Sequence, residues 1–111
     1  MALSTHILDT SIGKPAAGVQ VELEILEKNV WKHLQSQNTD GDGRIKSLVA
    51  TGSLQKSVYR LRFFTKKYFE SQKRETFYPF VEVVFEVINE KENFHVPLLL
   101  NGYGFSTYRG S

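Results

Sequence analysis

Apolar and polar residues alternate with a period of two in four stretches of this chain. The apolar positions are Val19, Val21, Leu23 and Ile25; Tyr59, Leu61 and Phe63; Val81, Val83, Phe85 and Val87; and Phe94, Val96 and Leu98. Glutamates, arginines and glutamines occupy most of the positions between them. Successive side chains of a strand point to opposite faces of a sheet, so each stretch predicts a strand that buries one face and exposes the other.

Turn-forming sequences separate these stretches. They are "GKPAAG" at 13–18, "NTDGDG" at 38–43, "NEKEN" at 89–93 and "NG" at 101–102. Shorter strands at about 3–9 and 103–108 bring the expected number to about eight. Many short strands joined by such turns predict an all-β fold, an antiparallel Greek-key β-sandwich formed by a single domain that spans residues 1–111.

One segment departs from the alternation. Residues 65–75, "TKKYFESQKRE", contain strong helix formers after a threonine. Thr65 is a candidate N-cap, and the segment predicts one short helix within a connection between strands. The segment around 27–39 is expected to be a loop.

Composition changes this picture little. The chain has 111 residues, 41% of them hydrophobic and 13% aromatic, which is typical of a folded globular domain. It has no cysteine, so disulfides and thiolate metal sites are excluded. The net charge is only +2, and lysines and arginines are interspersed with glutamates along most of the chain, which is typical of a solvated surface rather than of a nucleic-acid-binding stripe. No apolar run approaches the ~20 residues of a membrane span, and "MALSTHILDT" does not have the pattern of a signal peptide. We therefore expect a cytoplasmic protein, or a periplasmic one if a signal peptide has been removed.

Two sets of residues invite a chemical interpretation. The loop 38–43 begins like a calcium-binding EF-hand loop, but Val49 stands where the bidentate glutamate is required, so a tight Asp-Gly turn is favoured. Of the three histidines, His6 and His95 are predicted to lie on the sheet face opposite the core residues of their strands. That face would be shielded if subunits packed against it. His33 lacks such a context and is interpreted as a surface residue.

The two ends of the chain and a short central motif resemble a known family. The motifs are "LSTHILDTSIGKPAAGV" at the start, "GR" at 43–44, and "YPFVEVVFEV" with "FHVPLLLNGYGFSTYRGS" at the end. Together they resemble the 5-hydroxyisourate hydrolases of the transthyretin-like family, over essentially the whole chain. The final "YRGS" is the most specific of them.

The resemblance implies a fold, an assembly and a reaction. Members of the family have the transthyretin-like sandwich and form homotetramers, as dimers of dimers, whose central channel holds the active sites. The reaction is hydrolysis of 5-hydroxyisourate to 2-oxo-4-hydroxy-4-carboxy-5-ureidoimidazoline in urate (purine) degradation, without a metal or cofactor. By the same resemblance, the catalytic residues would be His6, Arg44, His95 and Ser111, and Tyr108 would help to bind the substrate.

The residue types suit this chemistry. An imidazole with a pKa near neutrality can accept a proton from the attacking water, and Arg44 offers a planar cation for an oxygen-rich ring. Which of His6 and His95 is the base is left open. The alternative is a non-catalytic carrier that binds a small aromatic ligand in the same channel; neither nucleic acid nor membrane is expected as a partner.

Overall fold

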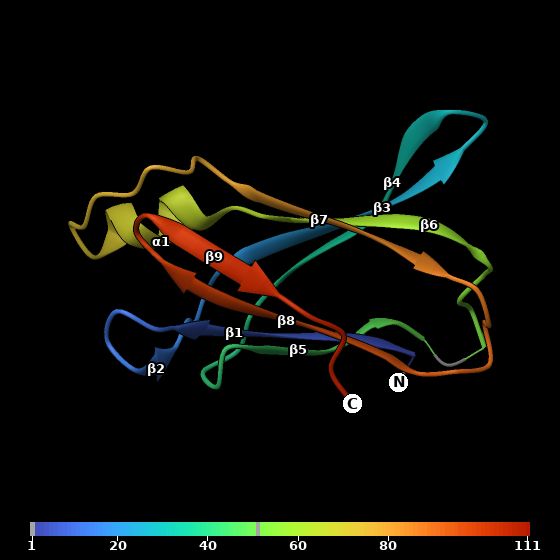
Figure 1. Ribbon diagram of the computed structural model, residues 1–111, viewed down its shortest axis with the longest axis horizontal. Coiled ribbons are helices and arrows are strands. Elements are labelled where there is room, and N and C mark those ends of the chain that lie inside the picture. Colours follow the sequence, from blue (N-terminus) through green and yellow to red (C-terminus); the bar gives the residue numbers. More distant parts are fainter. Residues whose placement is uncertain (1, 51) are drawn as a thin grey trace.

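The computed structural model describes residues 2–50 and 52–111, and within them it is a sandwich of two sheets with one short helix (Figure 1). The elements are β1 (Leu3–Asp9), β2 (Lys14–Pro15), β3 (Gln20–Glu27), β4 (Val30–Asn38), β5 (Arg44–Val49), β6 (Ser57–Phe63), α1 (Thr65–Ser71), β7 (Val81–Val87), β8 (Phe94–Asn101) and β9 (Gly104–Thr107). The predicted β-sandwich is confirmed, with nine strands in the described residues where about eight were expected.

The strands are divided between the sheets in a way that the local pattern did not specify. One sheet has the order β4-β3-β6-β7. The other has the order β2-β1-β8-β9, and β5 also pairs with β1. All pairs are antiparallel except β1 and β8, which run parallel with Ser4 opposite His95 and His6 opposite Pro97. This pairing places residues from the two ends of the chain side by side.

The core lies between the two sheets and is built from the apolar positions of the alternating strands. Leu23, Leu61 and Phe63 are fully buried on one side, and Ile7 and Leu98 on the other. Burial of each such side chain contributes roughly 1.5–3 kcal/mol to stability. The alternate positions of the same strands face outward, as the period of two predicts.

The segment 27–39 is not a loop, so that expectation was wrong. It forms a two-residue turn followed by β4, which pairs with β3 along its whole length. Lys28 and Asn29 both have positive φ, 52° and 64°, as a type I′ hairpin turn requires. β4 is an edge strand with mostly exposed positions, so it carries no alternation of buried apolar residues that could have revealed it.

The helix is confirmed but is shorter than predicted, and its cap differs. α1 ends at Ser71, and Lys73 already has a left-handed φ of 55°. Thr65 is not the N-cap: Phe64 occupies that position without a side-chain hydrogen bond, and Thr65 is the first helical residue. Its hydroxyl is buried with no hydrogen-bond partner among the described residues.

A polar cluster joins α1 and the segment after it to β1. Asp9 is fully buried, and its carboxylate accepts hydrogen bonds from the Tyr68 hydroxyl at 2.8 Å, from Ser11 and from the Arg74 guanidinium. Burial would raise the pKa of Asp9, but the hydrogen bonds from Arg74, Ser11 and Tyr68 outweigh it and lower that pKa below its usual value. Asp9 therefore stays ionised and holds the helical connection against the first sheet.

Candidate active site

The outer face of the sheet formed by β1, β5 and β8 carries most of the predicted site residues. His6 in β1 lies directly opposite Arg44 in β5, and His95 lies opposite Ser4 in the parallel pair. His6 and His95 are half-buried, whereas Ile7, Phe94 and Val96 are buried. The predicted orientation of both histidines, away from the core, is therefore confirmed.

A tight turn positions Arg44 at the start of β5. The Asp40 carboxylate accepts hydrogen bonds from the main-chain amides of Asp42 at 2.8 Å and Arg44 at 3.0 Å. Gly43 has a φ of +71°, and a Cβ there would lie 2.6 Å from the carbonyl oxygen of Ile7. This segment is thus the Asp-Gly turn that was favoured over a calcium loop. Among the residues that the structure describes, no group of three His, Asp or Glu side chains is placed to hold a metal ion.

Three of the predicted residues share one cavity of about 200 Å³. Arg44, His95 and Ser111 line it, and its other lining residues are Ser4, Thr5, Lys46, Asn93 and Phe94. His6 does not line this cavity, although it is paired with Arg44. The structure thus brings Arg44, His95 and Ser111 together and leaves His6 beside them.

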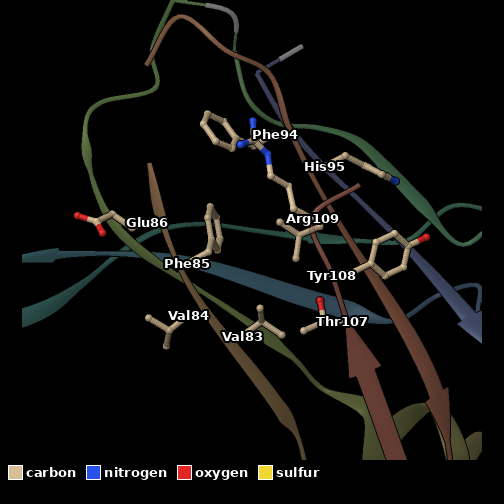
Figure 2. A pocket seen from close by; sticks show the side chains of 10 residues that line it. Val83, Val84, Phe85, Glu86, Phe94, His95, Thr107, Tyr108 and Arg109 are labelled. Carbon is tan, nitrogen blue, oxygen red and sulfur yellow. The ribbon is translucent and has the colours of Figure 1, made fainter. Parts of the chain in front are cut away.

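Tyr108 lies at a neighbouring cavity of about 240 Å³, on the other side of His95. Figure 2 shows this cavity, with β7 side chains such as Phe85 on one side and Tyr108 and Arg109 on the other. Its lining is mainly apolar: Val83, Val84, Phe85, Phe94 and Val96 contribute to it. His95 and Phe94 line both cavities, so they lie between the cavity of Arg44 and Ser111, which is lined mainly by polar residues and is called the polar cavity below, and this apolar one.

The last residues of the chain are held against β8. The main-chain amide of Gly110 donates to the carbonyl oxygen of His95 at 2.8 Å. The Arg109 guanidinium lies over the Phe94 ring, 4.6 Å from its centroid (Figure 2). It also lies 3.7 Å from a carboxylate oxygen of Glu92. These contacts place Ser111 at the polar cavity.

The electrostatic surroundings keep His95 neutral. Burial lowers its pKa below the usual 6.5, and the nearby His6 and Arg44 lower it further. A main-chain hydrogen bond with Ser4 opposes these effects by raising the pKa of His95. A neutral imidazole at pH 7 can accept a proton, which is the property required of a general base.

Five cavity residues were not predicted as site residues from the sequence: Ser4, Thr5, Lys46, Asn93 and Phe94. Ser4 is two residues before His6, Lys46 two after Arg44 and Asn93 two before His95. Residues two apart in a strand share a face, so this spacing was the available signal for Ser4 in β1 and Lys46 in β5, whereas Asn93 precedes the first residue of β8. His33, by contrast, was correctly interpreted as a surface residue. It lies on β4 in the other sheet, with its Nδ1 3.3 Å from a Glu22 carboxylate oxygen.

Comparisons with known proteins agree on one family. The model of the HIUase/Transthyretin family matches residues 3–110. A protein of Salmonella typhimurium named 5-hydroxyisourate hydrolase is 50% identical over 109 residues, which are 98% of this chain and 80% of that protein.

Two solved structures show the same fold. A 5-hydroxyisourate hydrolase of Klebsiella pneumoniae superposes with a TM-score of 0.86 at 38% identity, covering 98% of this chain and 92% of the other. Sea bream transthyretin in complex with thyroxine superposes with a TM-score of 0.93 at 27% identity, covering 99% and 95%. The backbone is thus shared by an enzyme and by a thyroxine-bound protein, and the side chains must distinguish them.

Proposed function

The chain belongs to the HIUase/transthyretin family, and on this premise we propose that it is a 5-hydroxyisourate hydrolase. The reaction adds water to the carbonyl carbon of the cyclic C6–N1 amide and breaks the carbon–nitrogen bond. The product is 2-oxo-4-hydroxy-4-carboxy-5-ureidoimidazoline, in which the former amide carbonyl has become a carboxylate. This step belongs to urate degradation.

One observation supports this proposal above the others: His95, Arg44 and Ser111 line one cavity, and His6 is paired with Arg44 beside it. His95 is kept neutral by its surroundings, so it can take the proton that the attacking water loses. Arg44 offers a permanently charged guanidinium to the oxygen on which negative charge develops. Ser111 contributes a hydroxyl at the wall of the cavity.

We infer that the site is completed in a homotetramer, a dimer of dimers, in which the outer face of this sheet lines a channel. The motivation is that His6 and Tyr108 flank the cavity without sharing it with Arg44. A second copy packed on this face would enclose the five predicted site residues, His6, Arg44, His95, Tyr108 and Ser111. Sedimentation velocity on the purified protein would test the assembly, and a monomer at assay concentration would contradict it.

The alternative is a carrier that binds a small aromatic ligand without hydrolysing it. The similarity to thyroxine-bound sea bream transthyretin is the observation in its favour. However, the cavity of this chain presents an imidazole and two cationic side chains, His95, Arg44 and Lys46, which suit a polar and oxygen-rich substrate. The hydrolase is therefore preferred.

An ultraviolet assay separates the two functions. Urate and urate oxidase generate 5-hydroxyisourate in the cuvette, and its decay is followed with and without the protein. We expect strong acceleration by the wild type. His6→Ala and His95→Ala should each lose ~10²–10⁴-fold in activity, the usual contribution of a general base or acid.

His33→Ala is the matched control, because His33 lies on the other sheet and its ring contacts the Glu22 carboxylate, away from the cavity. It should retain wild-type activity. A folded wild-type protein that gives no acceleration would overturn the hydrolase and favour the carrier. Full activity in either His6→Ala or His95→Ala would remove that histidine from the reaction.

A further inference from the structure

The segment after β9 continues the pairing of β9 with β8 after an interruption. Leu98 lies opposite Thr107 in the β8–β9 ladder, and an isolated bridge pairs His95 with Gly110 in the same register. Pro97 lies between these pairs and has no amide N–H to donate, and its carbonyl oxygen accepts a hydrogen bond from the Thr107 hydroxyl at 2.7 Å. The ladder resumes at Gly110, whose amide donates to the His95 carbonyl oxygen at 2.8 Å.

The continued register determines the side of the sheet on which Arg109 lies. Arg109 is opposite Val96, whose side chain is buried between the sheets. Because paired residues of antiparallel strands point to the same face, the Arg109 side chain points to the inner side of the sheet. Its guanidinium lies over the Phe94 ring, 4.6 Å from the centroid, and 3.7 Å from a carboxylate oxygen of Glu92. In Figure 2 the Arg109 side chain extends toward Phe94, whereas His95 points to the other side.

This orientation separates the Arg109 guanidinium from the polar cavity. Arg109 lines the apolar cavity, whereas the cationic side chains that line the polar cavity are Arg44 and Lys46. Its sequence position beside Gly110 and Ser111 would suggest that Arg109 binds the substrate directly. The structure instead directs its guanidinium to an aromatic ring and a carboxylate of its own chain. The effect of Arg109 on the polar cavity is therefore transmitted by the backbone of residues 109–111.

The two contacts of Arg109 are individually weak but act on the same short segment. The side chains of Arg109 and Glu92 are 59% and 49% exposed, so water and salt screen their ion pair. An exposed cation–π contact shifts an equilibrium by roughly 2- to 5-fold, and an exposed ion pair by up to about 5-fold. Together they favour the bound position of the segment by roughly tenfold.

We propose that Arg109 is a positioning residue, which fastens residues 109–111 to β8 and thereby holds the Gly110 backbone against the His95 ring and Ser111 at the polar cavity. A Cβ at residue 110 would lie 2.5 Å from Cδ2 of His95, so this backbone lies directly against the ring. Arg109 touches neither the substrate nor the attacking water. The consequence for turnover rests on the hydrolase function proposed above, whereas the attachment of the segment does not.

Hydrogen exchange of the Gly110 amide measures opening of this segment without substrate. Each rate is corrected for the rate of the same sequence in an unfolded chain. Arg109→Gln should raise the corrected rate about tenfold. Glu92→Gln keeps the stacking on Phe94 and should raise it about threefold. Arg109→Lys keeps the charge beside Glu92 without the planar stacking, so it should also be intermediate.

Lys32→Gln is the matched control. It removes the same charge from another exposed ion pair, which Lys32 on β4 forms with Glu27 at 3.8 Å. This pair belongs to the other sheet, so the corrected exchange rate of Gly110 and the hydrolase activity should both stay at their wild-type values.

Kinetics in the 5-hydroxyisourate decay assay supply the second readout. Arg109→Gln should lower kcat/KM roughly 3- to 10-fold, in proportion to the loss of the bound segment. The same substitution should cost less in a Ser111→Ala background, because the hydroxyl that it positions is then already absent. Arg109→Lys should recover part of kcat/KM.

The outcomes are distinct. A wild-type Gly110 amide that exchanges as fast as in an unfolded chain would overturn the proposal, because the segment would then not be held. Unchanged exchange in a folded Arg109→Gln would also overturn it, and an equal loss of kcat/KM in both backgrounds would then place the guanidinium on the substrate. If Arg109→Gln fails to fold, Glu92→Gln provides the same comparison. The expected exchange rates in a protein without hydrolase activity would contradict the proposed function and leave the attachment of the segment by Arg109 supported.

Discussion

Replacing Gly110 by alanine tests whether the final segment of the chain positions His95. The added Cβ would lie 2.5 Å from Cδ2 of His95 and 3.2 Å from a ring carbon of Pro97. Carbon atoms in contact are normally ~3.5–4.0 Å apart. The ring or the segment must therefore move by roughly 1 Å to restore ordinary contact with Cδ2.

The effect of such a displacement on the reaction rate is known to an order of magnitude. Misplacing a catalytic group by about 1 Å can cost on the order of 10²-fold in rate. We therefore expect kcat/KM of Gly110→Ala to fall roughly 100-fold in the 5-hydroxyisourate decay assay. Stability should change little, by about 1 kcal/mol or less, because Gly110 lies in the last residues of the chain and outside the core between the sheets.

Gly41→Ala is a suitable control. A Cβ at residue 41 has no heavy atom within 4 Å, and φ at this residue is not positive. The control should retain both activity and stability. If Gly110→Ala kept kcat/KM within about twofold of the wild type, the packing of the tail on His95 would have no part in catalysis, and the steric argument would be refuted.

Two further predictions concern a cavity residue and the buried carboxylate. Lys46→Gln should raise KM roughly 3- to 10-fold at low salt, because Lys46 lines the cavity beside Arg44 and adds a second cation for an oxygen-rich substrate. Lys46→Arg should stay close to wild type. Steady-state kinetics at two salt concentrations check this, and an unchanged KM would place Lys46 outside the site. Asp9→Asn should lower the free energy of unfolding at pH 7 by about 2–4 kcal/mol, since it leaves Arg74 without its buried partner. The pKa of Asp9 is lowered in the fold, so its contribution is fully present above the unfolded value of about 3.9 and is lost as the pH falls through the folded pKa. Urea denaturation at several acidic pH values should therefore show a flatter pH dependence in Asp9→Asn, and equal slopes in variant and wild type would contradict the role of this carboxylate.

The alternation of apolar and polar residues predicted the strands that bury one face. It predicted little about which strands pair with one another. Alternation identified β3, β6, β7 and β8 because their inward positions are apolar and their outward positions polar. It could not identify β4, whose edge position leaves most of its side chains in water. Nor could it reveal that β1 and β8 are parallel, because the partner of a strand depends on contacts between residues far apart in the chain.

The same limit applies to the candidate site. The period of two predicted that His6 and His95 lie on an outward face. The cavity also includes residues of β5, and in that strand only Ile45 and Leu48 are buried. Their spacing of three does not follow the period of a strand, and the β1–β5 register shifts between Leu3 and Thr5. Lys46 and Ser4 were therefore not expected, although each lies two residues from a predicted site residue. The prediction that Thr65 is the N-cap was wrong for a related reason: the buried position of Thr65 in the fold outweighed its local preference for the N-cap.

Two glycines explain why the motifs that carry the resemblance have the form Gly-Arg and Arg-Gly-Ser. At Gly43 a side chain would collide with the main chain of Ile7, and at Gly110 it would collide with the His95 ring. In each case the absence of a Cβ lets a chain segment approach β1 or β8 closely, and the next residue, Arg44 or Ser111, is delivered to the cavity. Glycine permits such close approach at the cost of backbone entropy. Here the close approach places the Arg44 guanidinium and the Ser111 hydroxyl at the cavity that His95 lines. The sandwich thus supplies a rigid face, and the site is assembled on it by two segments whose position depends on the lack of a side chain.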